Sequence, residues 1–171
     1  MSTMAEMLRS TMLQHRDRPA VVDEDRTRTY GAFVERVERA AGVLRGLGLA
    51  PGDRFGVIAP NTAANAELFF GGYWSGTVPV PVNVRLAPPE IRDVLEDARV
   101  KRLFVDAAFQ ALLDEEALAP WREGAVLVRA PDGTGSYEAR FAEAAPEPMH
   151  PGRPDDEAVL LYTGGTTGRS K

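Results

Sequence analysis

The segment RFGVIAPNTAANAELFFGGYWSGTVPVPVN, residues 54–83, decides the fold class. It begins with a short apolar run, RFGVIA, that is typical of a β-strand. A helical segment follows at 62–76, with Asn61 or Thr62 as the expected N-cap. An extended run at 78–83 ends the segment. A short strand, a helix and a second short strand are typical of an α/β protein with a largely parallel sheet.

The same alternation continues toward the C-terminus. The pattern predicts a helix at 88–98, a strand at 102–106, a helix at 107–118, a strand at 125–130, a short helix at 137–144 and a final strand at 157–163. Right-handed crossovers between parallel strands place helices on both faces of a sheet. We therefore expect an α/β fold, layered, with a largely parallel sheet and helices on both faces.

Before residue 54 the sequence predicts a different arrangement. Apolar residues recur at helical spacing near the N-terminus, at Met4, Met7, Leu8 and Met12. Residues 20–30 form a hairpin candidate, and Thr29 is the expected N-cap of a helix with an apolar stripe that extends to Leu47. Gly48 is the expected C-cap of that helix.

Composition excludes several classes of function. The chain has 171 residues, a net charge of −5 and no cysteine. The charge argues against non-specific nucleic-acid binding, and the lack of thiols excludes disulfides, thiolate zinc sites and a cysteine nucleophile. No apolar run approaches the ~20 residues of a membrane span, and the N-terminus does not resemble a signal peptide. We expect a cytoplasmic protein.

Two other features suggest sites but have simpler explanations. Gly46, Gly48 and Gly52 miss the GxGxxG spacing by one residue and follow a helix, whereas a dinucleotide fingerprint follows a strand. His15 and His150 have no partner at metal-ligand spacing, so we expect both to be surface residues and no metal site.

The segment 163–171, TGGTTGRSK, is the candidate functional site. Glycines let backbone amides approach an anion closely, threonine hydroxyls add donors, and Lys171 adds a positive charge. The spacing is not that of a Walker A loop, in which Gly-Lys-Ser/Thr would begin at the fifth residue after the first glycine. The alternative is a Gly/Thr-rich surface turn at the chain end.

The segment YTGGTTGRSK resembles the phosphate-binding loop of adenylate-forming (AMP-binding) enzymes, which include acyl-CoA synthetases, aryl-CoA ligases and the adenylation domains of peptide synthetases. Gly165-Thr166-Thr167-Gly168 and Lys171 match the family pattern, and Ser170 stands where the family usually has proline. Residues 19–61 and 76–98 are similar to the blocks that open these enzymes, in the same order.

The resemblance implies an activity and its site. Such enzymes join a carboxylate to the α-phosphate of Mg-ATP, release pyrophosphate, and transfer the acyl group to a thiol, usually CoA. The residues implied to hold the ATP phosphates are Thr163, Gly164, Gly165, Thr166, Thr167, Gly168 and Lys171. No catalytic residue is identified in the chain, and the ligands of Mg²⁺ are expected outside it.

The family resemblance also implies a domain organisation. Residues 1–171 correspond to the N-terminal portion of the large AMP-binding domain, ending at the loop 163–171, with an incomplete acyl-CoA synthetase-like fold. The remainder of that domain and the C-terminal domain are absent. The isolated chain is therefore expected to lack ligase activity, and its exposed sheet edge invites self-association.

The segment VPVNVRLAPPEI, residues 80–91, resembles acyl-CoA and aryl-CoA ligases. This resemblance favours an acid–CoA ligase that acts on medium- or long-chain fatty acids. An aryl-CoA ligase and a peptide-synthetase adenylation domain are alternatives. A non-catalytic truncated module that binds a partner is a further alternative, as is an α/β nucleotide-binding domain unrelated to ligases.

Overall fold

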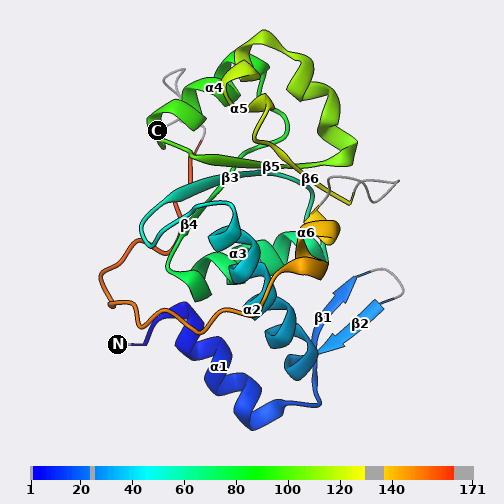
Figure 1. Ribbon diagram of the computed structural model, residues 1–171, viewed down its shortest axis with the longest axis vertical. Helices are drawn as coiled ribbons and strands as arrows, with labels where there is room; N and C mark the ends of the chain where they lie inside the picture. The colour runs from blue at the N-terminus through cyan, green and yellow to red at the C-terminus, as the bar shows by residue number, and fades with distance from the viewer. Residues whose placement is uncertain (1, 24–25, 130–136, 164–171) are drawn as a thin grey trace.

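A parallel sheet between two layers of helices forms the centre of the molecule (Figure 1). The structure, a computed structural model, describes residues 2–23, 26–129 and 137–163. The sheet has the order β4-β3-β5-β6. Its strands are β3 (Arg54–Ile58), β4 (Val78–Pro81), β5 (Arg102–Asp106) and β6 (Val126–Val128). The predicted α/β class, with a parallel sheet and helices on both faces, is confirmed.

The helices divide between the two faces as right-handed crossovers require. One face carries α2 (Tyr30–Gly46), α3 (Ala63–Ser75) and α6 (Tyr137–Glu143). The other carries α4 (Pro88–Asp97), the 3₁₀ helices η1 (Ala107–Asp114) and η2 (Glu116–Leu118), and the short helix α5 (Ala119–Arg122). Figure 1 shows α4 and α5 above the sheet and α2, α3 and α6 below it.

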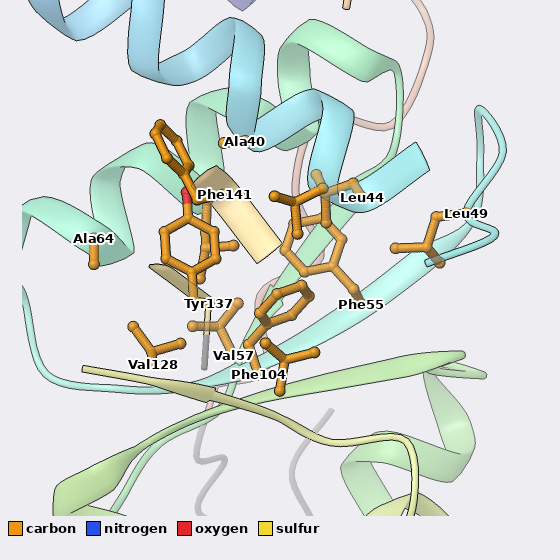
Figure 2. Close-up of a cluster of buried hydrophobic side chains, with 13 residues drawn as sticks. Ala40, Leu44, Leu49, Phe55, Val57, Ala64, Phe104, Val128, Tyr137 and Phe141 are labelled. Atoms are coloured by element: carbon orange, nitrogen blue, oxygen red, sulfur yellow. The ribbon is translucent and has the colours of Figure 1, made fainter. Parts of the chain in front are cut away.

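Each face of the sheet has its own hydrophobic core because side chains alternate along a strand. Phe55, Val57 and Phe104 point toward α2, α3 and α6 (Figure 2). The rings of Phe55 and Phe104 meet edge to face with centroids 5.5 Å apart. Ile58, Leu103 and Val105 instead pack with the side chains of α4. Burial of both faces accounts for the continuous apolar sequence of the central strands.

A third cluster joins the N-terminal elements to α2 and α3. These elements are α1 (Met4–His15) and the antiparallel hairpin of β1 (Pro19–Asp23) with β2 (Arg26–Thr29), as predicted. A capping box formed by Thr3 and Glu6 begins α1. None of the helices in the described ranges combines the length and the apolar character needed to cross a bilayer.

The predicted N-caps agree with the structure, whereas the C-cap predicted for α2 is displaced by one residue. Thr29 Oγ1 accepts a hydrogen bond from the Ala32 amide at 3.3 Å. Of the two residues considered for α3, Thr62 is the cap, since its hydroxyl accepts from the Asn65 amide at 3.3 Å. The C-cap of α2 is Leu47, and Gly48 is the next residue, with φ +82°, the left-handed conformation that glycine favours after a helix.

Residues 107–118 were expected to form one α-helix, and that prediction is wrong. The segment divides into η1 and η2 because Glu115 between them is extended, with ψ 136°. Arg122 donates to the backbone oxygens of Leu113, Asp114 and Glu115. The guanidinium thus occupies the carbonyls that a continuing α-helix would need for its own hydrogen bonds.

The predicted final strand at 157–163 is also absent from the described residues. This segment lies beside β4, where the Leu160 amide donates to the Pro79 oxygen at 3.1 Å. The amides of Val78 and Val82 donate toward β3, so the alternate positions, Pro79 and Pro81, face the outer edge. Proline has no amide hydrogen, and this edge therefore offers acceptors without donors and cannot support a ladder.

A buried carboxylate connects α2 with α3. Glu67 is 0% exposed, and its two oxygens accept from Arg36 at 2.5 and 2.8 Å. Arg28 lies 3.6 Å from the same carboxylate. Arg36 also stacks over the ring of Phe141 at 4.0 Å and so includes α6 in the network. Charges removed from water are stable only when paired in this way.

We predict that Glu67→Ala lowers the free energy of unfolding by about 3 kcal/mol, because it leaves two guanidiniums without their buried partner. Glu35→Ala is the matched control, since Glu35 is also helical but forms an exposed pair with Arg16. The control should cost at most about 0.5 kcal/mol. Urea unfolding measures both variants, and equal losses would contradict the structural role assigned to Glu67.

A second prediction concerns the close crossing of α2 and α3. A Cβ added at Gly71 would lie 2.8 Å from the Cβ of Ala40, while a Cβ at Gly46 would meet nothing within 4 Å. Gly71→Ala should therefore destabilise the protein by about 1–3 kcal/mol. Gly46→Ala should leave stability unchanged or raise it by up to about 1 kcal/mol. Thermal unfolding of the two variants tests this prediction. A Gly71→Ala variant with unchanged stability would argue against the close contact of α2 with α3.

Candidate functional site

Only the first residue of the predicted phosphate loop lies in the described part of the chain. Thr163 is exposed at the end of the segment 157–163. Gly164, Gly165, Thr166, Thr167, Gly168 and Lys171 lie outside the described residues. The structure therefore defines how the chain reaches the loop, through contacts that fix residues 157–162.

An ion pair holds the start of this segment. Arg54, the first residue of β3, donates from Nε and Nη2 to the carboxylate of Glu157 at 2.8–3.1 Å. Its Nη1 also donates to the Ala98 oxygen at the C-terminus of α4, at 3.3 Å. A cation at this position complements the negative end of the helix dipole. One side chain thus joins the central strand, α4 and the segment that leads to the loop.

Apolar contacts hold the middle of the segment. Leu160 and Tyr162 pack against the core on the α4 face of the sheet, while Leu161 between them is 63% exposed. The alternation is that of extended backbone, although no ladder forms with β4. The hydrogen bond from Leu160 to Pro79 sets the segment beside the sheet edge.

Tyr162, the residue directly before Thr163, has a polar anchor. Its hydroxyl donates a hydrogen bond to Asp97 Oδ2 at the end of α4. Burial, together with the hydrogen bond to the Asp97 carboxylate and its charge, raises the pKa of Tyr162 to about 12. The phenol therefore remains protonated and able to donate at neutral pH.

The proline-rich connector before this segment is bound to α2 and α3. The Glu147 amide donates to the Glu38 oxygen at 3.0 Å, and the Trp74 indole donates to the Glu147 oxygen at 3.0 Å. A Cβ at Gly42 would lie 2.0 Å from the Ala145 oxygen, so the connector requires glycine on α2. These contacts fix the path of the chain from α6 to residue 157.

The loop after β4 contains Asn83 and Arg85, two residues of the segment 80–91 that resembles acid–CoA ligases. Asn83 Oδ1 accepts a hydrogen bond from the Arg85 amide at 3.0 Å, which forms an Asx turn. Both side chains are exposed. Asn83 and Arg85 therefore form a turn after a strand, and we assign neither to the site.

Sequence reasoning missed an ion pair at the carboxyl ends of β5 and β6. Arg129 donates to both oxygens of Asp106, at 2.6 and 3.1 Å, and the Asp106 side chain is 2% exposed. Arg129 has φ +56°, which is uncommon for a residue with a side chain. Ligands of α/β proteins bind at the carboxyl ends of strands. The sequence signal that could have indicated this ion pair is Asp106, an aspartate at the end of the predicted strand 102–106.

The histidines differ in their surroundings. His15 is exposed at the end of α1, as expected. His150 is half-buried, and its amide donates to the Trp74 oxygen at 2.7 Å. Across the described ranges, no three His, Cys, Asp or Glu side chains gather in the manner of a metal site.

The chain resembles known ligases in sequence and in structure. It is 36% identical over 153 residues to the fatty acid–[acyl-carrier-protein] ligase ScoC of Streptomyces coeruleorubidus, covering 90% of this chain and 29% of the relative. It is 35% identical over 158 residues to the 3-hydroxybenzoate–CoA ligase of Aromatoleum sp. (strain CIB), covering 91% and 30%. A fatty acyl CoA synthetase of Mycobacterium tuberculosis superposes with a TM-score of 0.84 at 30% identity, covering 98% of this chain and 33% of the other.

This chain therefore spans less than a third of the length of the curated relatives described above. The sequence model of the AMP-binding enzyme family matches residues 8–171, which include the whole predicted loop. Because that match covers nearly all of the sequence, the chain belongs to the AMP-binding enzyme family.

Proposed function

We propose that this chain is the N-terminal part of an ATP-dependent acid–thiol ligase. The enzyme would convert a carboxylate and ATP into an acyl-adenylate and pyrophosphate, and then transfer the acyl group to CoA. The observation that carries the proposal is the family match through residue 171, because it includes the Gly-Thr-Thr-Gly sequence and Lys171. The relatives are themselves named as ligases.

In this proposal the loop binds the phosphates of ATP. The backbone amides of Gly164, Gly165 and Gly168 approach the β- and γ-phosphates, and Thr163, Thr166 and Thr167 add hydroxyl donors. Lys171 adds a positive charge that offsets the charge of the departing pyrophosphate. Mg²⁺, held by residues outside this chain, would supply further charge neutralisation.

The anchors of residues 157–162 would limit the positions available to the loop. Glu157 is held by Arg54, Leu160 by Pro79, and Tyr162 by Asp97. Catalysis by positioning loses rate when a binding group is displaced by about 1 Å. We therefore assign Tyr162 and Arg54 a positioning role, in which they act through the loop rather than by contact with ATP.

A fatty acid is the substrate class we propose, since ScoC and the mycobacterial structure are both named for fatty acids or fatty acyl groups. The nearly equal identity to a 3-hydroxybenzoate–CoA ligase makes aryl acids the necessary comparison. A location in the cytoplasm, where ATP and CoA are available, completes the proposal.

The test is acid-dependent ATP–pyrophosphate exchange by the protein from its natural source, together with its intact mass. We expect a mass about three times 18.6 kDa, since relatives are about three times longer. We also expect faster exchange with fatty acids than with aryl acids.

Lys171→Ala should lower the exchange rate about 100-fold, whereas Arg9→Ala on the exposed face of α1 should not. The 171-residue chain alone should show no exchange. A native mass of 18.6 kDa, or exchange by the chain alone, would contradict the proposal.

The anchor at Tyr162 gives a separate prediction about pH. Since its folded-state pKa of about 12 exceeds the value near 10 of an unfolded chain, the anchor's contribution to stability is full below about pH 10. It is lost as the pH rises through 12. The tyrosinate absorbance of the protein minus that of Tyr162→Phe isolates this titration. Asp97→Asn should move its midpoint part of the way back toward 10. A midpoint near 10 in the unaltered protein would argue against the anchor.

A further inference from the structure

A cavity outside the predicted phosphate loop is lined by residues from the start of β5, from α5 and from α6. It has a volume of about 410 Å³ and opens at the amino ends of β5 and β6. The segment 157–163 lies beside β4, at the opposite edge of the sheet order β4-β3-β5-β6. None of the residues that line the cavity belongs to the segment 157–163, which leads to the loop proposed for ATP.

Three cations line this cavity against one carboxylate. The cations are Lys101, Arg102 and Arg140, and the carboxylate is Glu123. This excess is notable in a chain with a net charge of −5. Like charges gathered in one concavity raise its positive potential and attract anions.

The partners of these cations leave donors available to a ligand. Lys101 is paired with Asp53 at 2.6 Å. Arg102 donates from Nε to the Leu47 oxygen at 3.1 Å and from Nη1 to the Lys101 oxygen at 3.3 Å. These carbonyls hold the guanidinium in place without cancelling its charge. Arg140 is exposed, and within the described part of the chain its side chain makes no hydrogen bond or ion pair, while its backbone oxygen accepts from the Ala144 amide at 2.9 Å.

One wall of the cavity is an oriented aromatic ring. Trp121 lines the cavity, and its indole Nε1 donates to the Val100 oxygen at 2.9 Å. That bond fixes the ring beside the cationic groups. Leu47 and Leu103 add apolar surface. Polar and charged groups form most of the lining, and the indole ring with the two leucines supplies its apolar part.

We propose that this cavity binds a small phosphorylated molecule, with its phosphate on Arg102 and Arg140 and its apolar or ring portion against Trp121. Guanidinium groups match the geometry of phosphate oxygens and bind them with charge-assisted hydrogen bonds. The volume exceeds that of a bare phosphate ion, which leaves space for an organic group. The site does not depend on the proposed ligase function.

Phenyl phosphate is a suitable probe because it combines a dianion with one ring. The chain has two tryptophans, and Trp74 is buried away from the cavity, so the indole signal of Trp121 is a specific reporter by NMR. We expect saturable shifts of the Trp121 indole and the Gly124 amide, while the Trp74 indole stays unchanged. Phenol should give no saturable shift.

Arg140→Ala should weaken binding at least tenfold, whereas Arg9→Ala should not. Each variant removes one positive charge from an exposed helical arginine, so the pair separates a site from general attraction. Glu123→Gln should strengthen binding by removing the repelling carboxylate. Lys171→Ala should have no effect, which separates this site from the predicted loop. Non-saturable shifts, equal losses in the two arginine variants, or dependence on Lys171 would each overturn the proposal.

Discussion

The pairing of β3 with a parallel neighbour on each side is the interaction on which the rest of the structure depends. The Val78 and Val82 amides donate to the oxygens of Asp53 and Val57 on one side, at 2.8 and 2.9 Å. On the other side the Lys101 amide donates to the Arg54 oxygen at 2.9 Å. Parallel neighbours require crossovers, and these place helices on both faces of β3. The two hydrophobic cores follow directly from that arrangement.

The prolines of β4 limit the sheet on one side. Pro79 and Pro81 leave the outer edge of β4 with carbonyl oxygens but without amide donors, so the segment 157–163 makes a single bond there instead of a ladder. Side-chain hydrogen bonds hold the segment to the rest of the protein instead. Arg54 binds Glu157, and Tyr162 binds Asp97. The same prolines protect β4 against pairing with a strand of another copy.

Charged groups in this protein act where backbone hydrogen bonding ends. Arg54 binds the Ala98 oxygen after α4, and Arg102 binds the Leu47 oxygen after α2. Arg122 binds three oxygens at the end of η1. Each guanidinium satisfies oxygens that the helix leaves unpaired. Glu67 differs because it is buried between helices, where it pairs with Arg36 and Arg28. The polar groups therefore fix the positions of the helices and strands relative to one another. Burial of the apolar cores provides the driving force for their assembly.

The sequence by itself determined the fold class, most helix starts and the family resemblance. These depend on local periodicity, on caps such as Thr29 and Thr62, and on the motif at 163–171. Each of these features involves only residues that are close together in the sequence. The division of 107–118 into η1 and η2 depended on Arg122, and the missing ladder at 157–163 depended on which edge of β4 its prolines face. The burial of Glu67 and the cationic cavity likewise bring together residues distant in the chain. Only tertiary structure decided these features, because each depends on which non-local group lies nearest.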